Sequence, residues 1–106
     1  MSVTIATKTL DKLHHLESLY QRGYQSEMID RSLDKIMALE YAAAQRELTD
    51  LQQRLQRFET QYQLTSAEFH TKFQAGELGD SADFVEWSAF YDMWLAVRER
   101  LEVLQS

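Results

Sequence analysis

Apolar side chains recur every three or four residues along most of this chain, which is the period of an amphipathic helix. The first run of this kind contains Leu10, Leu13, Leu16 and Tyr20. Gly23 follows the run, and glycine is the residue that most often closes a helix in the left-handed conformation. The sequence therefore predicts a first helix over residues 9–22.

The second run is longer and settles into a heptad rhythm. Ser26 offers a side-chain oxygen as N-cap, and no glycine or proline follows before Gly76. Steps of four and three alternate between apolar residues at Met37, Tyr41, Ala44, Leu48, Leu51, Leu55, Phe58 and Tyr62. The pattern predicts one coiled-coil-like helix over residues 27–62, about 54 Å long at 1.5 Å per residue.

Two shorter helices are expected after it. Thr65 and Glu68 have the spacing of a capping box, which predicts a short helix over residues 65–75. The turn GELGD follows, and its Gly79 is a candidate for a positive φ. Asp80 or Ser81 then caps a last helix over residues 80–104, whose apolar sector is too wide for a two-stranded coiled coil.

These segments define an all-α fold in a single domain, residues 1–106. The long central helix is flanked by a short N-terminal helix and a C-terminal helical pair. The chain has no proline and only three glycines, so little interrupts a helix. A chain of 106 residues has room for one core.

The heptad stripe of the long helix must be covered by other apolar groups. We expect a homodimer in which two long helices pair, because the other helices are shorter and are split by the GELGD turn. The self-association residues would be Tyr41, Leu48, Leu51, Leu55 and Phe58. The alternative is a monomeric hairpin in which the last helix folds back along the long one.

Charge is distributed unevenly. The chain carries a net charge of −6. Residues 59–92 contain seven carboxylates and only one basic side chain, Lys72. These acids are either a solvated face that favours helix starts or a docking surface for a basic partner. The large aromatic residues beside them are either core residues or interface anchors. The candidate partner-binding residues are Glu77, Asp80, Asp83, Glu86, Trp87, Tyr91 and Trp94.

Several classes of function find no support. There is no cysteine, no apolar run of about 20 residues and no signal-like start, so we expect a cytoplasmic protein that does not enter a membrane. The acidic balance disfavours direct nucleic-acid binding. No nucleophile motif, phosphate-binding loop or metal-ligand spacing is present, so we expect no catalytic residues, no metal and no cofactor, and we predict that the protein is not an enzyme.

The C-terminal half, FETQYQLTSAEFHTKFQAGELGDSADFVEWSAFYDMW, resembles small acidic helical proteins of bacteria and archaea that are assigned as antitoxins of toxin–antitoxin pairs. The most specific piece is GELGDSADFVEW, and the upstream LYQRGYQSEMIDRSLDKIMALE also looks like these proteins. The resemblance covers residues 10–100. It implies a protein that binds a small basic toxin, a ribonuclease by expectation, and holds it inactive. The alternative function is a homo-oligomeric coiled-coil scaffold or adaptor without a toxin partner.

Overall fold

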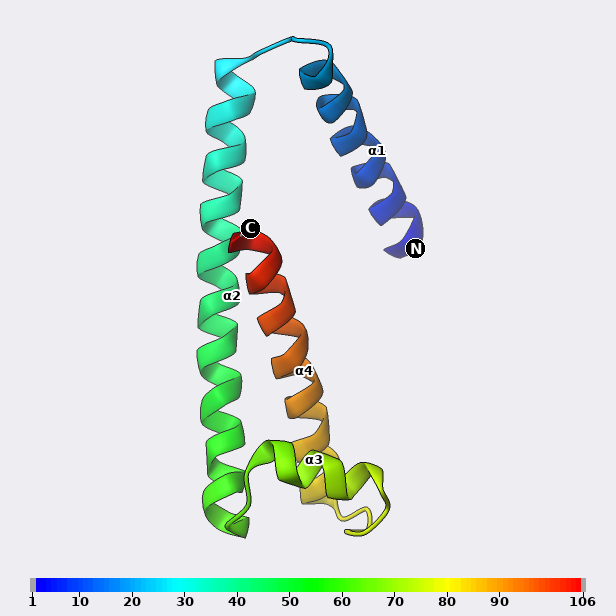
Figure 1. Ribbon diagram of the computed structural model, residues 1–106, viewed down its shortest axis with the longest axis vertical. Coiled ribbons are helices and arrows are strands. Elements are labelled where there is room, and N and C mark those ends of the chain that lie inside the picture. Colours follow the sequence, from blue (N-terminus) through cyan, green and yellow to red (C-terminus); the bar gives the residue numbers. More distant parts are fainter. Residues whose placement is uncertain (1, 106) are drawn as a thin grey trace. The chain divides into compact units, whose positions relative to one another are not determined.

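The computed structural model describes the backbone of residues 2–105 and the side chains of residues 7–105. These residues form four helices joined by turns: α1 (Ser2–Gln21), α2 (Glu27–Tyr62), α3 (Ser66–Gln74) and α4 (Ala82–Gln105) (Figure 1). The predicted all-α fold with one long central helix is confirmed, and α2 has the predicted bounds. The chain divides into two compact units, Met1–Ile36 and Met37–Ser106, which we call the first and second units.

The first helix is longer than predicted. It begins at Ser2, seven residues before the expected start. The segment 2–8 has no helical apolar stripe and is rich in β-branched residues, so pattern reasoning left it out. Such residues disfavour a helix by only a few tenths of a kcal/mol each. In the absence of a glycine or proline, the helix continues through them.

The first unit is a helical hairpin made of α1 and the first part of α2. Gly23 has φ +93°, and the N–H of Tyr24 donates to the carbonyl of Leu19 at 3.1 Å, so α1 ends as predicted. Ser26 caps α2 by accepting a hydrogen bond from the N–H of Ile29 at 3.2 Å. The two helices are also tied by the hydroxyl of Tyr20, which donates to Oδ1 of Asp30 at 2.6 Å.

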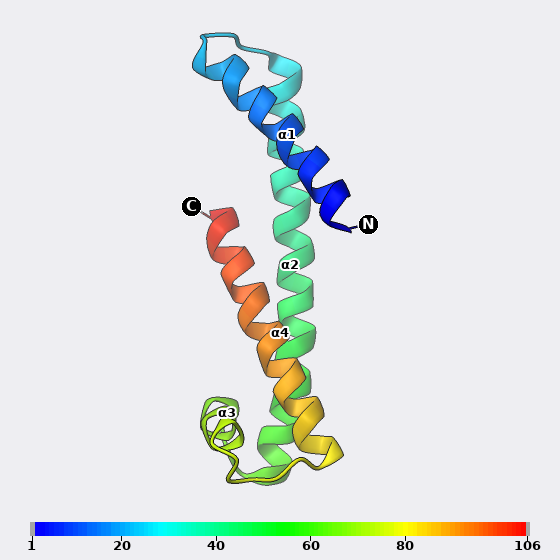
Figure 2. The ribbon, with the colours of Figure 1, turned by 90° about the vertical axis from the view of Figure 1, so that its right-hand side faces the viewer.

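In the second unit α4 returns alongside the C-terminal half of α2, and α3 lies near the end where α4 begins (Figures 1 and 2). Two groups of buried side chains hold these helices together. One contains Ala44, Leu51 and Val97, and the other contains Leu55, Phe69 and Trp87. The wide apolar sector of α4 contributes to both groups, as its sequence predicted.

The residues assigned to a dimer interface are covered within one chain. Leu51 and Leu55 are buried, and Leu48 and Phe58 pack against the same two groups. The hydroxyl of Tyr41 accepts a hydrogen bond from Nε2 of Gln105 at 2.7 Å. Leu51 and Leu55 are therefore not available to a second chain, and the last helix folds back along the long one, as in the alternative arrangement. The reason is that α4 is apolar enough, and long enough, to cover the heptad stripe itself.

The short helix α3 begins as the capping box predicts. Oγ1 of Thr65 accepts a hydrogen bond from the N–H of Glu68 at 3.1 Å. A further free N–H of the first turn, that of Ser66, donates to Oε2 of Glu59 at 2.8 Å. Glu59 thus links the end of α2 to the start of α3.

The turn between α3 and α4 needs glycine at a defined position. Gly79 has φ +76°, as its place in the GELGD turn suggested, and a Cβ added there would meet open space. A side chain at Gly79 would therefore destabilise the fold only through the unfavourable left-handed backbone conformation and not through a steric clash. Ser81 then caps α4 by accepting a hydrogen bond from the N–H of Phe84 at 3.3 Å.

Gly79→Ala is expected to lower the free energy of unfolding by about 1 kcal/mol, the cost of a left-handed backbone at a residue with a Cβ. Thermal melting followed by far-ultraviolet circular dichroism measures the loss. Glu77→Ala is the matched control, because Glu77 is exposed in the same turn and has no positive φ. Equal melting temperatures for Gly79→Ala and the control would contradict the left-handed backbone conformation assigned to Gly79.

Candidate protein-binding surface

Trp87, expected as a possible anchor for a partner, is the centre of the core. Its side chain is fully buried, and its ring stacks on Phe69 with the centroids 3.9 Å apart and on Phe58 with the centroids 5.4 Å apart. The indole Nε1 donates to Oγ of Ser66, also buried, at 2.9 Å. Trp87 therefore cannot contact a partner of the folded chain, and its assignment as an interface residue is wrong.

Tyr91 and Trp94 remain partly accessible one and two turns further along α4. Their rings stack on each other with the centroids 5.7 Å apart, and both are half-buried. His70 of α3 lies against Tyr91 at 4.9 Å between ring centroids, and the guanidinium of Arg98 lies 4.7 Å from the centre of Trp94. Within the described residues, Nε1 of Trp94 and Nδ1 of His70 have no hydrogen-bond partner. Both atoms are themselves buried, so they are not presented to a partner of the folded chain.

The acidic candidates differ in how free they are. Glu77 and Asp80 are exposed on the turn before α4. Glu86 is also exposed, and it borders a surface hollow whose other lining residues include Arg54 and Arg57 of α2. Asp83 is half-buried, and its Oδ2 accepts a hydrogen bond from the hydroxyl of Tyr62 at 2.5 Å. Asp83 therefore has a structural partner, whereas Glu77 and Asp80 are free to meet another molecule.

The negative charge of this region is not neutralised within the chain. Among the residues that the structure describes, ion pairs join His14 to Glu17, Arg31 to Glu27, Arg54 to Asp50 and Arg100 to Glu47. None of these involves a carboxylate between residues 59 and 92. Side chains of the first unit are balanced, five basic against five acidic, so the whole net charge of −6 resides in the second unit. The α3–α4 region carries an uncompensated negative potential.

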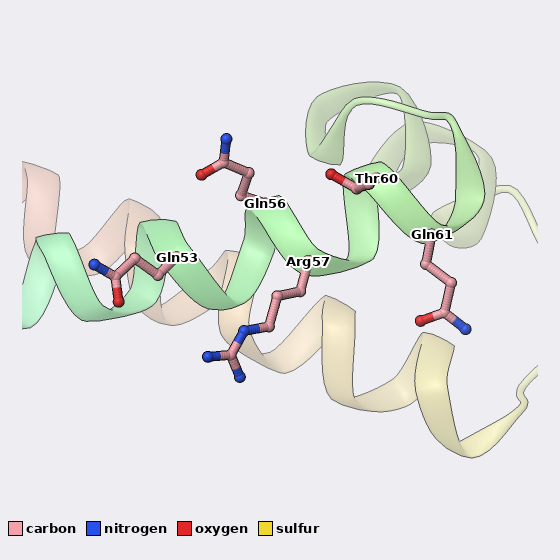
Figure 3. Close-up of a pocket in the computed structure, with 5 residues that line it drawn as sticks. All are labelled: Gln53, Gln56, Arg57, Thr60 and Gln61. Carbon is pink, nitrogen blue, oxygen red and sulfur yellow. The ribbon is translucent and has the colours of Figure 1, made fainter.

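A surface hollow on α2 lacks the features of a small-molecule site. A hollow of about 540 Å³ is lined by Gln53, Gln56, Arg57, Thr60 and Gln61, all on α2. Figure 3 shows that their polar ends point in different directions and do not converge on one point. Ligand sites bring a few polar groups together in a concave, mostly apolar pocket, and this face does not.

Two further features bear on the candidate functions. Residues 2–105 contain no group of three or more histidine, aspartate or glutamate side chains that could hold a metal ion. No helix within the same residues is both long and apolar enough to cross a bilayer.

Comparisons with protein-family models, with curated proteins and with solved structures found no match to this chain.

Sequence reasoning missed the two hydrogen bonds that organise this region. The heptad pattern predicts Tyr62 only as the last position of the apolar stripe, and the capping-box spacing of Thr65 and Glu68 assigns no role to Ser66. Each bonds to a residue 21 positions away in the chain, Asp83 and Trp87 respectively. Both pairs form because α4 folds back beside α3 and the end of α2. No local sequence pattern announces such pairs.

Ser66→Ala is expected to destabilise the second unit by about 1–3 kcal/mol, because the buried N–H of Trp87 would lose its acceptor. Chemical denaturation followed by tryptophan fluorescence measures the change. Ser88→Ala is the control, since it removes the other buried serine hydroxyl, which does not bond to Trp87. A loss for Ser88→Ala as large as that for Ser66→Ala would show that the Trp87 bond has no special weight.

Tyr62 gives the protein a contribution to stability that depends on pH. Its hydrogen bond to the Asp83 carboxylate, together with burial and the negative charge of Asp83, raises the pKa of Tyr62 above the ordinary tyrosine value. The neutral phenol is therefore the form that the fold favours. Its contribution is complete below the unfolded pKa of about 10 and is lost as the pH rises through the raised value.

Tyr62→Phe is therefore expected to melt below the wild type at neutral pH, with the gap closing as the pH rises above about 10. Melting curves of both proteins across the alkaline range test this. Comparing the two proteins at each pH removes the effect of Tyr20, whose pKa is also raised, first by its hydrogen bond to Asp30. A gap that stays constant with pH would contradict the role given to this bond.

Proposed function

We propose that this protein is a non-catalytic binding protein of the antitoxin type, which binds a small basic toxin and holds it inactive. The observation that carries the proposal is the uncompensated charge of the second unit. Seven carboxylates lie between residues 59 and 92, and none of them has an ion-pair partner among the described residues. Protein surfaces of one sign steer and orient partners of the opposite sign.

The turn between α3 and α4 supplies the charged part of the proposed surface. Glu77 and Asp80 are exposed there, and their carboxylates accept no hydrogen bond from the described part of the chain. A protein that binds RNA presents a basic groove shaped for phosphates, and carboxylates can occupy the same groove. A ribonuclease toxin, which the sequence resemblance implies, is a partner of this chemistry.

Tyr91 and Trp94 supply the part of the surface that desolvates on binding. Both rings are half-buried, so a partner can cover their remaining faces without unfolding α4. Tryptophan and tyrosine of this kind dominate the affinity of many interfaces, while charges at the rim mainly set the association rate.

The scaffold alternative loses its main support. It rested on the heptad stripe of α2 as a self-association surface, and the part of that stripe from Ala44 to Tyr62 packs within the same chain. The charge distribution favours an unlike partner, because two copies of an acidic surface repel each other.

The double charge reversal Glu77→Lys with Asp80→Lys is expected to remove the partner that co-purifies with the tagged wild-type chain from its native host. The partner would be identified by mass spectrometry and then purified. With the purified partner, the reversal should slow association and flatten its salt dependence, because attraction between exposed charges is screened by salt. Growth assays complete the test, since expression of the partner alone should arrest growth and co-expression of the wild-type chain should restore it.

The matched control is the double variant Glu40→Lys with Glu99→Lys. These two acids are exposed on α2 and α4 and lie outside the acidic region of residues 59–92, and their reversal changes the net charge by the same amount. It should retain the partner. Equal binding by the two double variants, or a partner that is acidic, would refute the proposed surface.

A further inference from the structure

The first unit lacks a core of its own. Within residues 7–36 no side chain is buried, and large apolar side chains stay open to solvent. Leu10 is 53% exposed, Leu13 49% and Ile36 52%. The second unit, by contrast, buries the side chains of two compact groups. The apolar faces of α1 and of the start of α2 are therefore only partly covered by other side chains.

These faces form one apolar groove. It has a volume of about 210 Å³ and is lined by Leu13, Leu16, Glu17, Tyr20, Ile29 and Leu33. Ile36 extends the apolar sector of α2, and Leu10 extends that of α1, because each lies three residues from a lining residue on the same helix. Only Glu17 among the lining residues is charged.

A unit of 36 residues needs support that its own core cannot give. Chain segments below about 40 residues usually depend on disulfides, metals or association. The chain has no cysteine, and its described residues offer no metal-binding group. Continuity with the rest of α2 supports the start of that helix but not α1. Association is the means that remains.

The charge of the first unit selects a second copy as the occupant. Its five basic side chains are Lys8, Lys12, Arg22, Arg31 and Lys35, and its five acidic ones are Asp11, Glu17, Glu27, Asp30 and Asp34. Two copies of this neutral unit meet without net repulsion, whereas a contact between two second units would oppose two net charges of −6. In a two-fold interface each residue meets its counterpart in reverse, so mixed signs can pair across it.

We propose that the first units of two chains pack groove to groove and form a four-helix bundle, so that the protein is a homodimer. Each copy contributes two helices, and the apolar sectors of α1 and α2 form the shared core, as in other bundles of paired helical hairpins. A standard interface draws on about 20–30 residues from each partner, which this unit can supply. The acidic surface of the second unit is not part of the interface.

The inference does not depend on the proposed function. Self-association is measured on the purified chain alone, whereas partner binding is measured with the toxin-like protein. A monomer that still binds the partner would refute only the dimer. A dimer that binds no basic partner would refute only the antitoxin-type function.

Sedimentation equilibrium of the full chain at tens of micromolar is expected to give twice the chain mass of 12.5 kDa. Ile36→Glu should raise the dissociation constant of the dimer more than about 100-fold, because it buries an unpaired charge in the shared core. Ala38→Glu is the matched control, since it adds the same charge at an exposed position about 200° around the same helix, and it should leave the dimer intact. Both tryptophans lie in the second unit, so their fluorescence shows whether that unit remains folded in each variant.

A second measurement uses the absence of native cysteine. A single spin label on Lys35→Cys, an exposed position, can give a dipolar distance only when two chains associate. We expect a defined distance for this variant and its loss when Ile36→Glu is added. A monomeric wild type, a dimer that survives Ile36→Glu, or equal weakening by Ala38→Glu would each overturn the proposal.

Discussion

The stacking of Trp87 between α2 and α3 is the interaction on which the second unit depends. Its ring stacks on Phe69 of α3 and on Phe58 of α2. Its N–H donates a hydrogen bond to Oγ of Ser66 at the start of α3. A nine-residue helix such as α3 is too short to be stable alone. Because one side chain of α4 contacts both α2 and α3, the loss of its contacts would weaken the packing among all three helices.

The two units differ in both packing and net charge. The second unit has a buried core and the whole net charge, while the first has neither. A buried core lets a surface carry uncompensated acids, because packing offsets the mutual repulsion of the charges. A neutral unit with an open apolar groove is suited to association instead. Partner binding and self-association can therefore occupy separate parts of one small chain.

The helices could be predicted from the sequence, but the choice of what covers them could not. Helix periodicity, Gly23, Ser26 and Thr65 gave the elements and most of their ends, since each acts over a few neighbouring residues. The heptad stripe at Leu51 and Leu55 looks the same whether a second chain or α4 covers it. That choice depends on how far α4 reaches along α2, a long-range property of the fold.

The candidate site shows the same limit. Acidic residues on the turn, Glu77 and Asp80, could be recognised as free because turns lie at the surface. Trp87 and Tyr91 are one helical turn apart on the same face of α4, yet the first is buried and the second is half-exposed. The difference arises from how completely α2 and α3 together cover each successive turn of α4. Neither composition nor period contains that information.

The lack of a core in the first unit also bears on the lifetime of the chain in a cell. Segments with few buried contacts open with little free energy, and proteases cut open segments first. Residues 7–36 contain no buried side chain, so degradation would begin there even while the Trp87 core remains intact. The rate at which the protein disappears would then be set by the opening of α1 and not by the stability of the second unit. Any molecule that covers the groove would lengthen the lifetime of the acidic surface without touching it.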